Sequence, residues 1–296
     1  MTTSGVAARP GGAGDGVLAR HPLVSFFVLA FAGSWVVELP VVLSRTGTGA
    51  LPYDLPPIAD ALLIAAATFT GPTMAAFVMA RVAEGPEGPR RLLRRYLQWR
   101  VKFRWYVFVL LVIPASEIVG AVVLPGAVTS YQPVTAAMAL GYPLAFVSTF
   151  VLGGPLGEEP GWRGFALPRL QAARGPLVGS VVLGVVWAVW HFPLFWTGVW
   201  TPLSLGNVLM FVAMITALTV VMSWVFNNVG GSLLITMLMH ASFNTFANKI
   251  VAPMFPAPLL TEYGLLPELV GFGIVAIVVV AATRGRLSYR VDRAVT

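Results

Sequence analysis

The sequence Gly157-Glu158-Glu159-Pro160-Gly161-Trp162-Arg163-Gly164 lies inside a long apolar region of the chain. It places two adjacent carboxylates and an arginine where the neighbouring residues predict a membrane-spanning helix. An ionisable group at membrane depth is costly unless it is paired or hydrated, so by default it marks a functional site. The fold around these residues must therefore enclose a polar site that contains water.

The composition predicts an integral membrane protein. The 296 residues are 57% hydrophobic and 10% charged, whereas soluble domains are about 25% charged. We expect one transmembrane bundle over residues 21–285, between a disordered cytoplasmic tail at 1–20 and a short basic tail at 286–296. Cysteine is absent, which excludes disulfides, thiolate metal ligands and a cysteine nucleophile. The net charge of +7 comes from loops between apolar runs, so the expected partner is the lipid bilayer and no nucleic acid.

Eight apolar runs approach the ~20 residues that a helix needs to cross a bilayer. They lie near residues 23–43, 58–81, 105–125, 138–157, 176–197, 205–226, 230–250 and 265–283. The expected fold is therefore all-α, a polytopic bundle of about eight transmembrane helices. If the amino terminus is cytoplasmic, only Arg45 and Lys249 of the 19 Lys and Arg residues fall on the outer side. Short cytoplasmic loops carry an excess of basic residues, so both termini are expected to be cytoplasmic.

Residues 82–104 form the one sizeable polar connection between the apolar runs. Arginines at 90, 91, 94 and 95 with leucines between them predict a short amphipathic helix on anionic lipid headgroups. The alternative is that these arginines only set the topology of the chain.

Glu158 and His191 are expected to lie at the same depth in the bundle. Glu158 lies 17 residues before Gly175, in the turn between the fourth and fifth runs, and His191 lies 16 residues after it. At about 1.5 Å of rise per residue, an antiparallel hairpin brings the two side chains to nearly the same level.

His240 and Asn244 are the other polar residues in apolar surroundings. They lie 10 and 14 residues past the turn at Gly230, and their i, i+4 spacing puts both on one helix face. Their depth is comparable to that of Glu158 and His191. The sequence thus predicts that side chains from three separate spans meet around one water-containing cavity.

Glu159 and Arg163 have the i, i+4 spacing that lets a carboxylate and a guanidinium meet on one helix face. This pair would neutralise Arg163 at depth and leave Glu158 free for chemistry. The alternative is that all three residues form a buried ion network that only fixes helix packing. Two carboxylates for one arginine, however, leave one charge to explain.

These residue types support hydrolysis of a peptide bond. A carboxylate beside a histidine can deprotonate a water, and a second histidine with an amide can donate hydrogen bonds to an oxyanion. Alternatively, Glu158, His191 and His240 could hold a divalent metal such as zinc, with an open position for water. The histidines could also serve only as polar contacts between helices.

The remaining polar residues in or near the apolar runs are not assigned to the catalytic site. Glu38 and Asp60 lie near the outer ends of their helices and are expected to be structural, whereas no role is predicted for Glu117. Ser232 could act as a nucleophile with His240, but two helical turns separate them and the glutamates would go unused. The sequence contains no His-Glu-x-x-His motif and no pair of intramembrane aspartates, and no internal repeat that would favour a transporter.

Three motifs together resemble those of the CPBP family of intramembrane endopeptidases, which comprises type II CAAX prenyl proteases and bacteriocin-processing relatives. The motifs are Glu158-Glu159-x-x-x-Arg163-Gly164, Trp187-x-x-x-His191 and His240-x-x-x-Asn244. The longer run at 158–168 is similar to the form seen in prokaryotic members. The resemblance implies an eight-helix protease in a prokaryotic cytoplasmic membrane, and we expect its site to open toward the cytoplasm.

The resemblance implies catalytic roles for Glu158, His191, His240 and Asn244 and supporting roles for Glu159, Arg163 and Trp187. Trp187 stands where phenylalanine is more usual. The implied partner is a membrane-associated peptide or protein, either a prenylated CAAX peptide or another membrane peptide. The alternative is a non-proteolytic scaffold or bacteriocin-immunity protein that binds a peptide in the same cavity. The sequence predicts no oligomeric state.

Overall fold

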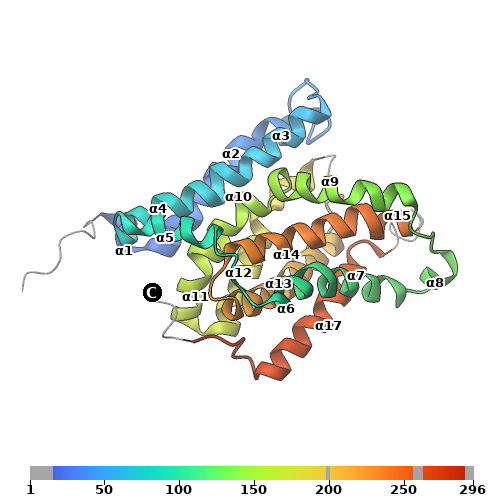
Figure 1. Ribbon diagram of the computed structural model, residues 1–296. Helices are drawn as coiled ribbons and strands as arrows, with labels where there is room; N and C mark the ends of the chain where they lie inside the picture. The colour runs from blue at the N-terminus through green and yellow to red at the C-terminus, as the bar shows by residue number, and fades with distance from the viewer. Residues whose placement is uncertain (1–15, 198–200, 256–262, 291–296) are drawn as a thin grey trace, which may run out of the picture.

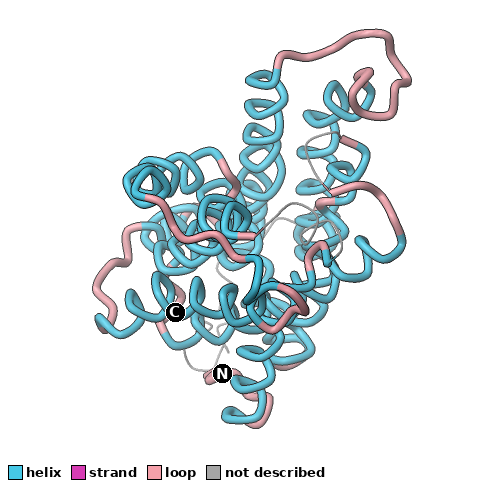
Figure 2. The backbone as a smooth tube through the Cα atoms, turned by 90° about the vertical axis from the view of Figure 1, so that its right-hand side faces the viewer, coloured by secondary structure: helices cyan, strands magenta, loops and turns pink. Residues whose placement is uncertain are grey.

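The computed structural model describes residues 16–197, 201–255 and 263–290, and these residues form helices joined by turns and loops, with no strand (Figure 2). Seven helical segments among them are long and apolar enough to cross a membrane. They are Pro22–Leu43, Pro57–Glu84, Phe103–Val122, Ala136–Arg174, Pro176–Trp196, Leu205–Asn228 and Leu266–Thr283. The prediction of an all-α, polytopic membrane protein is therefore confirmed.

The first half of the chain folds into short and long helices on both sides of the expected polar connection. In chain order they are α1 (Val17–Arg20), α2 (Pro22–Leu43), α3 (Pro57–Thr68), η1 (Phe69–Thr73), α4 (Met74–Glu84), α5 (Glu87–Tyr96), α6 (Phe103–Val107), η2 (Phe108–Val112), α7 (Ile113–Val122), α8 (Ala127–Ser130) and α9 (Ala136–Leu152). The helix expected around residues 90–97 is α5. Proline occupies the first position of α2 and α3, where its missing N–H costs nothing.

The second half carries the three motifs. Its elements are α10 (Pro155–Glu159), η3 (Pro160–Ala166), α11 (Leu167–Arg174), α12 (Pro176–Trp190), η4 (Phe192–Trp196), α13 (Leu205–Asn228), α14 (Leu233–Phe246), η5 (Ala247–Val251), α15 (Ala252–Met254) and α17 (Leu266–Thr283). The eighth expected span, residues 230–250, is helical as α14 and η5. It is not among the seven apolar segments, because His240, Asn244 and Lys249 lower its hydropathy.

A break separates α9 from the helix that carries the glutamates. The chain leaves α9 at Gly153 and passes through Gly154, whose φ of 104° is accessible mainly to glycine. Pro155 then starts the run α10–η3–α11, which continues α9 inward as predicted. No residue of α9 is buried, whereas every residue from 157 to 167 is buried. Figure 1 shows α10 leaving α9 and running toward α11.

The bundle has two chemically different ends. We call the arginine-rich end the one formed by residues 84–104, the turns at 174–176 and 227–233, and residues 284–290. Two hydrogen bonds join these segments: Gln98 Nε2 donates to the carbonyl oxygen of Val229 at 3.1 Å, and Asn227 Nδ2 donates to that of Leu287 at 2.9 Å.

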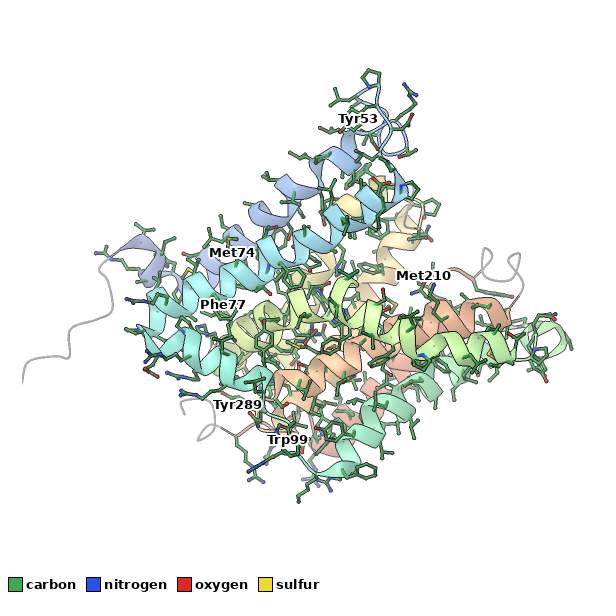
Figure 3. All side chains as sticks on the ribbon, turned by 45° about the horizontal axis from the view of Figure 1, so that its top comes forward. Tyr53, Met74, Phe77, Trp99, Met210 and Tyr289 are labelled. Carbon is green, nitrogen blue, oxygen red and sulfur yellow. The ribbon has the colours of Figure 1, made fainter. Side chains whose placement is uncertain are left out.

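The arginine-poor end is formed by loop 44–56, by residues 122–135, and by the region of η4, η5 and α15. Figure 1 shows α8, α15 and the connection between α2 and α3 across the bundle from α5 and α11. In Figure 3, Tyr53 marks the tip of loop 44–56, and Trp99 and Tyr289 lie at the arginine-rich end.

The expected tails overlap the described residues only in part. Residues 1–15 and 291–296 lie outside them. Val17–Arg20 form the single turn α1, which contacts α4. In the basic tail, the side chain of Leu287 is buried against the bundle, so residues 284–290 belong to the folded part of the chain.

Candidate active site

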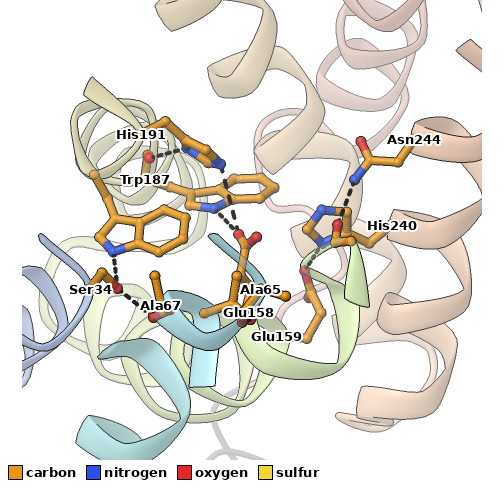
Figure 4. A network of polar contacts seen from close by, with 12 residues as sticks. Ser34, Ala65, Ala67, Glu158, Glu159, Trp187, His191, His240 and Asn244 are labelled. Carbon is orange, nitrogen blue, oxygen red and sulfur yellow. Dashed lines mark hydrogen bonds and ion pairs between the residues drawn. The ribbon is translucent and has the colours of Figure 1, made fainter. Parts of the chain in front are cut away.

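Glu158 is held in place by the packing of α10 against η1 and α3. A Cβ atom on Gly157 would lie 2.1 Å from Thr68 Oγ1, so only glycine allows this approach. Thr73 Oγ1 also donates a hydrogen bond to the Gly157 carbonyl oxygen at 2.6 Å. The Glu158 side chain is thereby directed toward α12, where the indole Nε1 of Trp187 donates to its Oε2 at 2.7 Å. Figure 4 shows this contact.

His191 faces the same carboxylate from the end of α12. Its Nδ1 lies 2.8 Å from the carbonyl oxygen of Trp187, and a carbonyl only accepts, so Nδ1 carries the hydrogen. In the neutral ring Nε2 then presents a lone pair. Nε2 lies 4.0 Å from Glu158 Oε2, which is too long for a direct hydrogen bond and allows one water to bridge the two atoms.

Glu159 accepts hydrogen bonds from two side chains with a single carboxylate oxygen. Its Oε1 accepts from Arg163 Nη1 at 2.9 Å and from His240 Nδ1 at 2.8 Å. The side chains of Glu159 and Arg163 are both fully buried. The predicted i, i+4 pair of Glu159 and Arg163 is confirmed. These two residues form the buried ion network that was the alternative interpretation for all three charged residues. Glu158 is not needed as the counter-ion of Arg163.

Arg163 has two further contacts that fix its guanidinium. Its Nη2 donates to Met222 Sδ at 2.9 Å, and its Cζ lies 4.1 Å from the centre of the Trp187 ring. The second contact is a cation–π interaction. Trp187 therefore touches both Glu158 and Arg163, and its supporting role stays a prediction.

The structure brings His240 and Asn244 to the same region. The His240 ring stacks on Phe243, with ring centres 5.1 Å apart and planes 5° apart. Asn244 Nδ2 donates to the Gly153 carbonyl oxygen at 3.3 Å. The four predicted catalytic residues thus meet from α10, α12 and α14 (Figure 4), with Asn244 at the α9–α10 break rather than against Glu158.

These four residues line one cavity of about 710 Å³, within the usual range for ligand sites. Sequence reasoning missed Glu38, which lines the cavity, is 2% exposed and interacts electrostatically with Glu158. Glu38 lies on α2, which packs against η4 just after α12 and is tied to the end of α12 by a hydrogen bond of 2.9 Å from Trp35 Nε1 to the Trp190 carbonyl oxygen. The available signal was a carboxylate at membrane depth.

The expected metal ligands do not form a cage in this arrangement. Within the described ranges, no three His, Asp or Glu side chains are placed to hold one ion. The contacts of Nδ1 of His240 with Glu159 and of Trp187 with Oε2 of Glu158 leave Nε2 of the ring and Oε1 of the carboxylate uncommitted. The prediction of a metal stays a prediction, and no catalytic step below uses one.

Two residues weighed from the sequence have other surroundings. Ser232 Oγ donates to the Gln98 carbonyl oxygen at 2.6 Å and accepts from Ile235 N at 3.3 Å, so this side chain caps α14. Glu117 is fully buried, and within the described residues neither carboxyl oxygen has a hydrogen-bond partner.

The cavity lies on the arginine-poor side of Glu158. Its lining comes from the C-terminal part of α2, from α3, from the end of α12 with η4, from the first half of α13 and from the start of α17. We expected the arginine-rich end and the cavity mouth to share the cytoplasmic side. The side of the membrane on which the cavity opens stays a prediction.

The fold and this site define a class, that of polytopic α-helical membrane proteins with a buried carboxylate–imidazole site. Residues 139–246 match the family model described as "Type II CAAX prenyl endopeptidase Rce1-like", and this region is an Rce1-like domain. The match contains Glu158, His191, His240 and Asn244. The family resemblance predicted from the three motifs is confirmed.

One curated relative is "CAAX prenyl protease 2" of Methanococcus maripaludis, which is 46% identical over 37 residues. The aligned stretch covers 12% of this chain and 14% of the relative. The chain thus aligns with only a small part of that protein. These comparisons do not favour the alternative of a non-proteolytic scaffold.

Proposed function

We infer that this chain is an intramembrane endopeptidase that hydrolyses a peptide bond in a membrane-associated peptide or protein, as a multi-pass protein of a prokaryotic cytoplasmic membrane. One observation carries the inference. Glu159 neutralises Arg163, while Glu158 lines the cavity 4.0 Å from His191. A buried carboxylate that no ion pair requires, beside an imidazole, is the arrangement of a general base.

In the proposed reaction, Glu158 takes a proton from a water that also donates a hydrogen bond to Nε2 of His191. The water oxygen attacks the peptide carbonyl carbon and forms a tetrahedral oxyanion. Glu158 then passes the proton to the amide nitrogen as the C–N bond breaks. The products are a carboxylate and an amine, and the carboxylate of Glu158 is regenerated. The Trp187 indole holds Oε2 throughout.

His240 and Asn244 are the proposed donors to the oxyanion. Glu159 accepts from Nδ1 of His240, and the proposed donor to the oxyanion is the Nε2–H that the ring carries when both of its nitrogens are protonated. Asn244 uses one amide hydrogen on the Gly153 carbonyl oxygen and has a second to offer. Donors aimed at the developing charge are worth about 10²–10³ in rate each.

The lining of the cavity supports an apolar peptide as substrate. Leu152, Leu194 and Phe211 line it together with the polar catalytic groups. The printed name of the Methanococcus maripaludis relative adds one candidate, a prenylated carboxyl-terminal CAAX peptide. Purified protein in detergent should cut such a peptide or another membrane peptide, with the products identified by mass spectrometry.

Variants of His191 and Asn244 separate this proposal from peptide binding without cleavage. His191→Ala and Asn244→Ala should each lower the cleavage rate while the peptide remains bound. A scaffold would show binding in all variants and no cleavage in the wild-type protein, and that result would overturn the proposal.

Metal content needs its own measurement. The donor types of Glu158, His191 and His240 led us to predict a divalent metal such as zinc, and the cavity geometry does not require one. Stoichiometric metal in active protein, with loss of cleavage after chelation, would support that prediction. Full activity after chelation, with no metal bound, would support the glutamate mechanism alone.

Gly154→Ala is expected to lower cleavage by about 100-fold, the size of effect that ångström-scale misplacement of a catalytic group can have. A Cβ atom on Gly154 would lie 2.3 Å from Glu158 Oε1, and the backbone φ is 104°. The carboxylate must therefore move or the α9–α10 break must change. The matched control is Gly141→Ala on α9, where a Cβ meets nothing within 4 Å. Equal activity of the two variants would contradict the geometry.

A further inference from the structure

A second cavity, of about 210 Å³, lies between α4, α5 and the run η3–α11 (Figure 1), and it shares no lining residue with the active-site cavity. Close backbone packing builds its walls. A Cβ atom on Gly88 of α5 would lie 2.2 Å from the Ala80 carbonyl oxygen of α4. A Cβ atom on Gly164 of η3 would lie 2.5 Å from Leu92 Cδ1. The three elements are therefore in direct contact around the cavity.

Three arginines and one glutamate line this cavity: Arg91, Arg95, Arg169 and Glu84. Glu84 contacts Arg169 Nη2 through Oε1, and its Oε2 lies 3.7 Å from Arg91 Nη2. Burial lowers the pKa of the Arg95 guanidinium; Glu84 raises it, and the charges of Arg91 and Arg169 lower it further. One carboxylate does not balance three guanidinium groups, so the cavity has an excess of positive charge.

The guanidinium groups are positioned by the backbone and keep donors for a ligand. Arg95 Nη1 donates to the Gly164 carbonyl oxygen at 3.2 Å, and Arg169 Nη1 donates to the Phe165 carbonyl oxygen at 2.9 Å. Within the described part of the chain, Arg91 has only its long contact with the glutamate, which exceeds hydrogen-bond length. Each guanidinium carries five N–H donors. Most of these donors are therefore free to bind an anion.

The same helix exposes leucines beside the cavity. Leu93 is 52% exposed and Leu97 is 77% exposed, and their i, i+4 spacing puts both on one face of α5. Arg91 and Arg95 have the same spacing on a neighbouring face. An amphipathic helix that lies in a membrane interface buries such leucines at the boundary of headgroups and acyl chains. Its arginines then lie at the level of the lipid phosphates.

We propose that the cavity between α4, α5 and η3–α11 binds the phosphate group of an anionic membrane lipid, with Arg91, Arg95 and Arg169 as donors. The planar fork of a guanidinium matches phosphate oxygens in bidentate geometry. The volume of about 210 Å³ is below the ~300 Å³ of the smallest usual ligand pockets, which suits a headgroup phosphate whose acyl chains remain outside. The expectation of a helix resting on headgroups thereby becomes a discrete site. The proposal does not rest on peptide cleavage.

The first test compares two pairs of charges on one helix. Arg91→Gln with Arg95→Gln removes two charges from the cavity. Arg90→Gln with Arg94→Gln is the matched control, because it removes two exposed arginines of α5 that pair with Glu87 and do not line the cavity. Both double variants have the same net charge, so a diffuse attraction between protein and lipid would weaken equally in the two.

The second test blocks the cavity and leaves its charges in place. Ala172 is exposed on α11 and lines the cavity, so Ala172→Trp fills its rim. Ala173→Trp is the control, since Ala173 is exposed beside it and does not line the cavity. This pair decides the question if loss of the hydrogen bond from Arg95 to η3 unfolds the first double variant.

Each purified protein in a nonionic detergent is titrated with a short-chain phosphatidylglycerol, with phosphatidylcholine of the same chains, and with inorganic phosphate. Native mass spectrometry counts the bound lipid, and the rise of the thermal unfolding midpoint with lipid concentration gives the affinity. We expect one phosphatidylglycerol per wild-type chain. Binding should be about 100-fold weaker in the Arg91 and Arg95 double variant, because each charged hydrogen bond contributes about tenfold or more. Ala172→Trp should also weaken it, and both controls should bind as the wild type does.

Three results would overturn the proposal. Equal weakening in the two double variants would show a diffuse attraction in place of a site. Wild-type affinity in Ala172→Trp would place the lipid outside the cavity. Equal affinity for phosphatidylcholine or for inorganic phosphate would remove the assignment to an anionic lipid. Because none of these measurements uses cleavage, a protein that binds the lipid as expected but cuts no peptide would contradict only the proposed function.

Discussion

Glu158→Gln is expected to abolish peptide cleavage while the protein remains folded. Glutamine keeps the size of the side chain and can still accept the hydrogen bond from Trp187 Nε1, which is 2.7 Å long in the wild-type protein. It cannot take a proton from water. Loss of a general base lowers rates by about 10²–10⁴. The measurement is the initial rate of peptide cleavage by purified protein, with the thermal unfolding midpoint as the check on folding.

The matched control is Glu87→Gln. Glu87 is an exposed glutamate on α5 whose ion pairs with Arg90 and Arg94 lie at the surface, where such pairs contribute little. This variant should cleave at the wild-type rate. If Glu158→Gln also did so, Glu158 would not be the base.

Arg163→Met is expected to cost about 3–5 kcal/mol of stability, the usual effect of leaving one partner of a buried ion pair alone. Arg163 is fully buried, and its loss removes the 2.9 Å contact with Glu159. It also removes the cation over the Trp187 ring. Denaturant titration in detergent micelles, followed by far-UV circular dichroism and by tryptophan fluorescence, measures the change.

Two further variants show whether the effect belongs to the pair. Arg174→Met removes an exposed arginine from the C-terminal end of α11 and should change stability little. The double variant Glu159→Gln with Arg163→Met removes both charges and should be more stable than Arg163→Met alone. If the double variant were the less stable, the cost would come from lost packing rather than from an unpaired carboxylate.

Much of the fold could be predicted because membrane helices are set by local properties. The length and hydropathy of apolar runs decide where a chain crosses a bilayer, and the expected runs coincide with the observed helices. The Glu159–Arg163 pair followed from helical spacing alone. The meeting of Glu158, His191 and His240 followed from counting residues from the turns, because antiparallel helices have a common rise per residue.

The rest depended on contacts between distant segments. Glu38 lines the cavity through the packing of α2 against distant segments, which includes the bond from Trp35 to the Trp190 carbonyl oxygen. The sequence places Trp187 four residues before His191, but not its indole nitrogen against Glu158.

The most direct test of the account is an experimental structure of the Glu158→Gln variant with an uncleaved peptide bound. The account predicts that the scissile carbonyl carbon lies about 3–3.5 Å from a water held between residue 158 and Nε2 of His191. It also predicts that the carbonyl oxygen points toward His240 and Asn244. A peptide bound elsewhere, or residue 158 turned to the lipid away from both histidines, would contradict it.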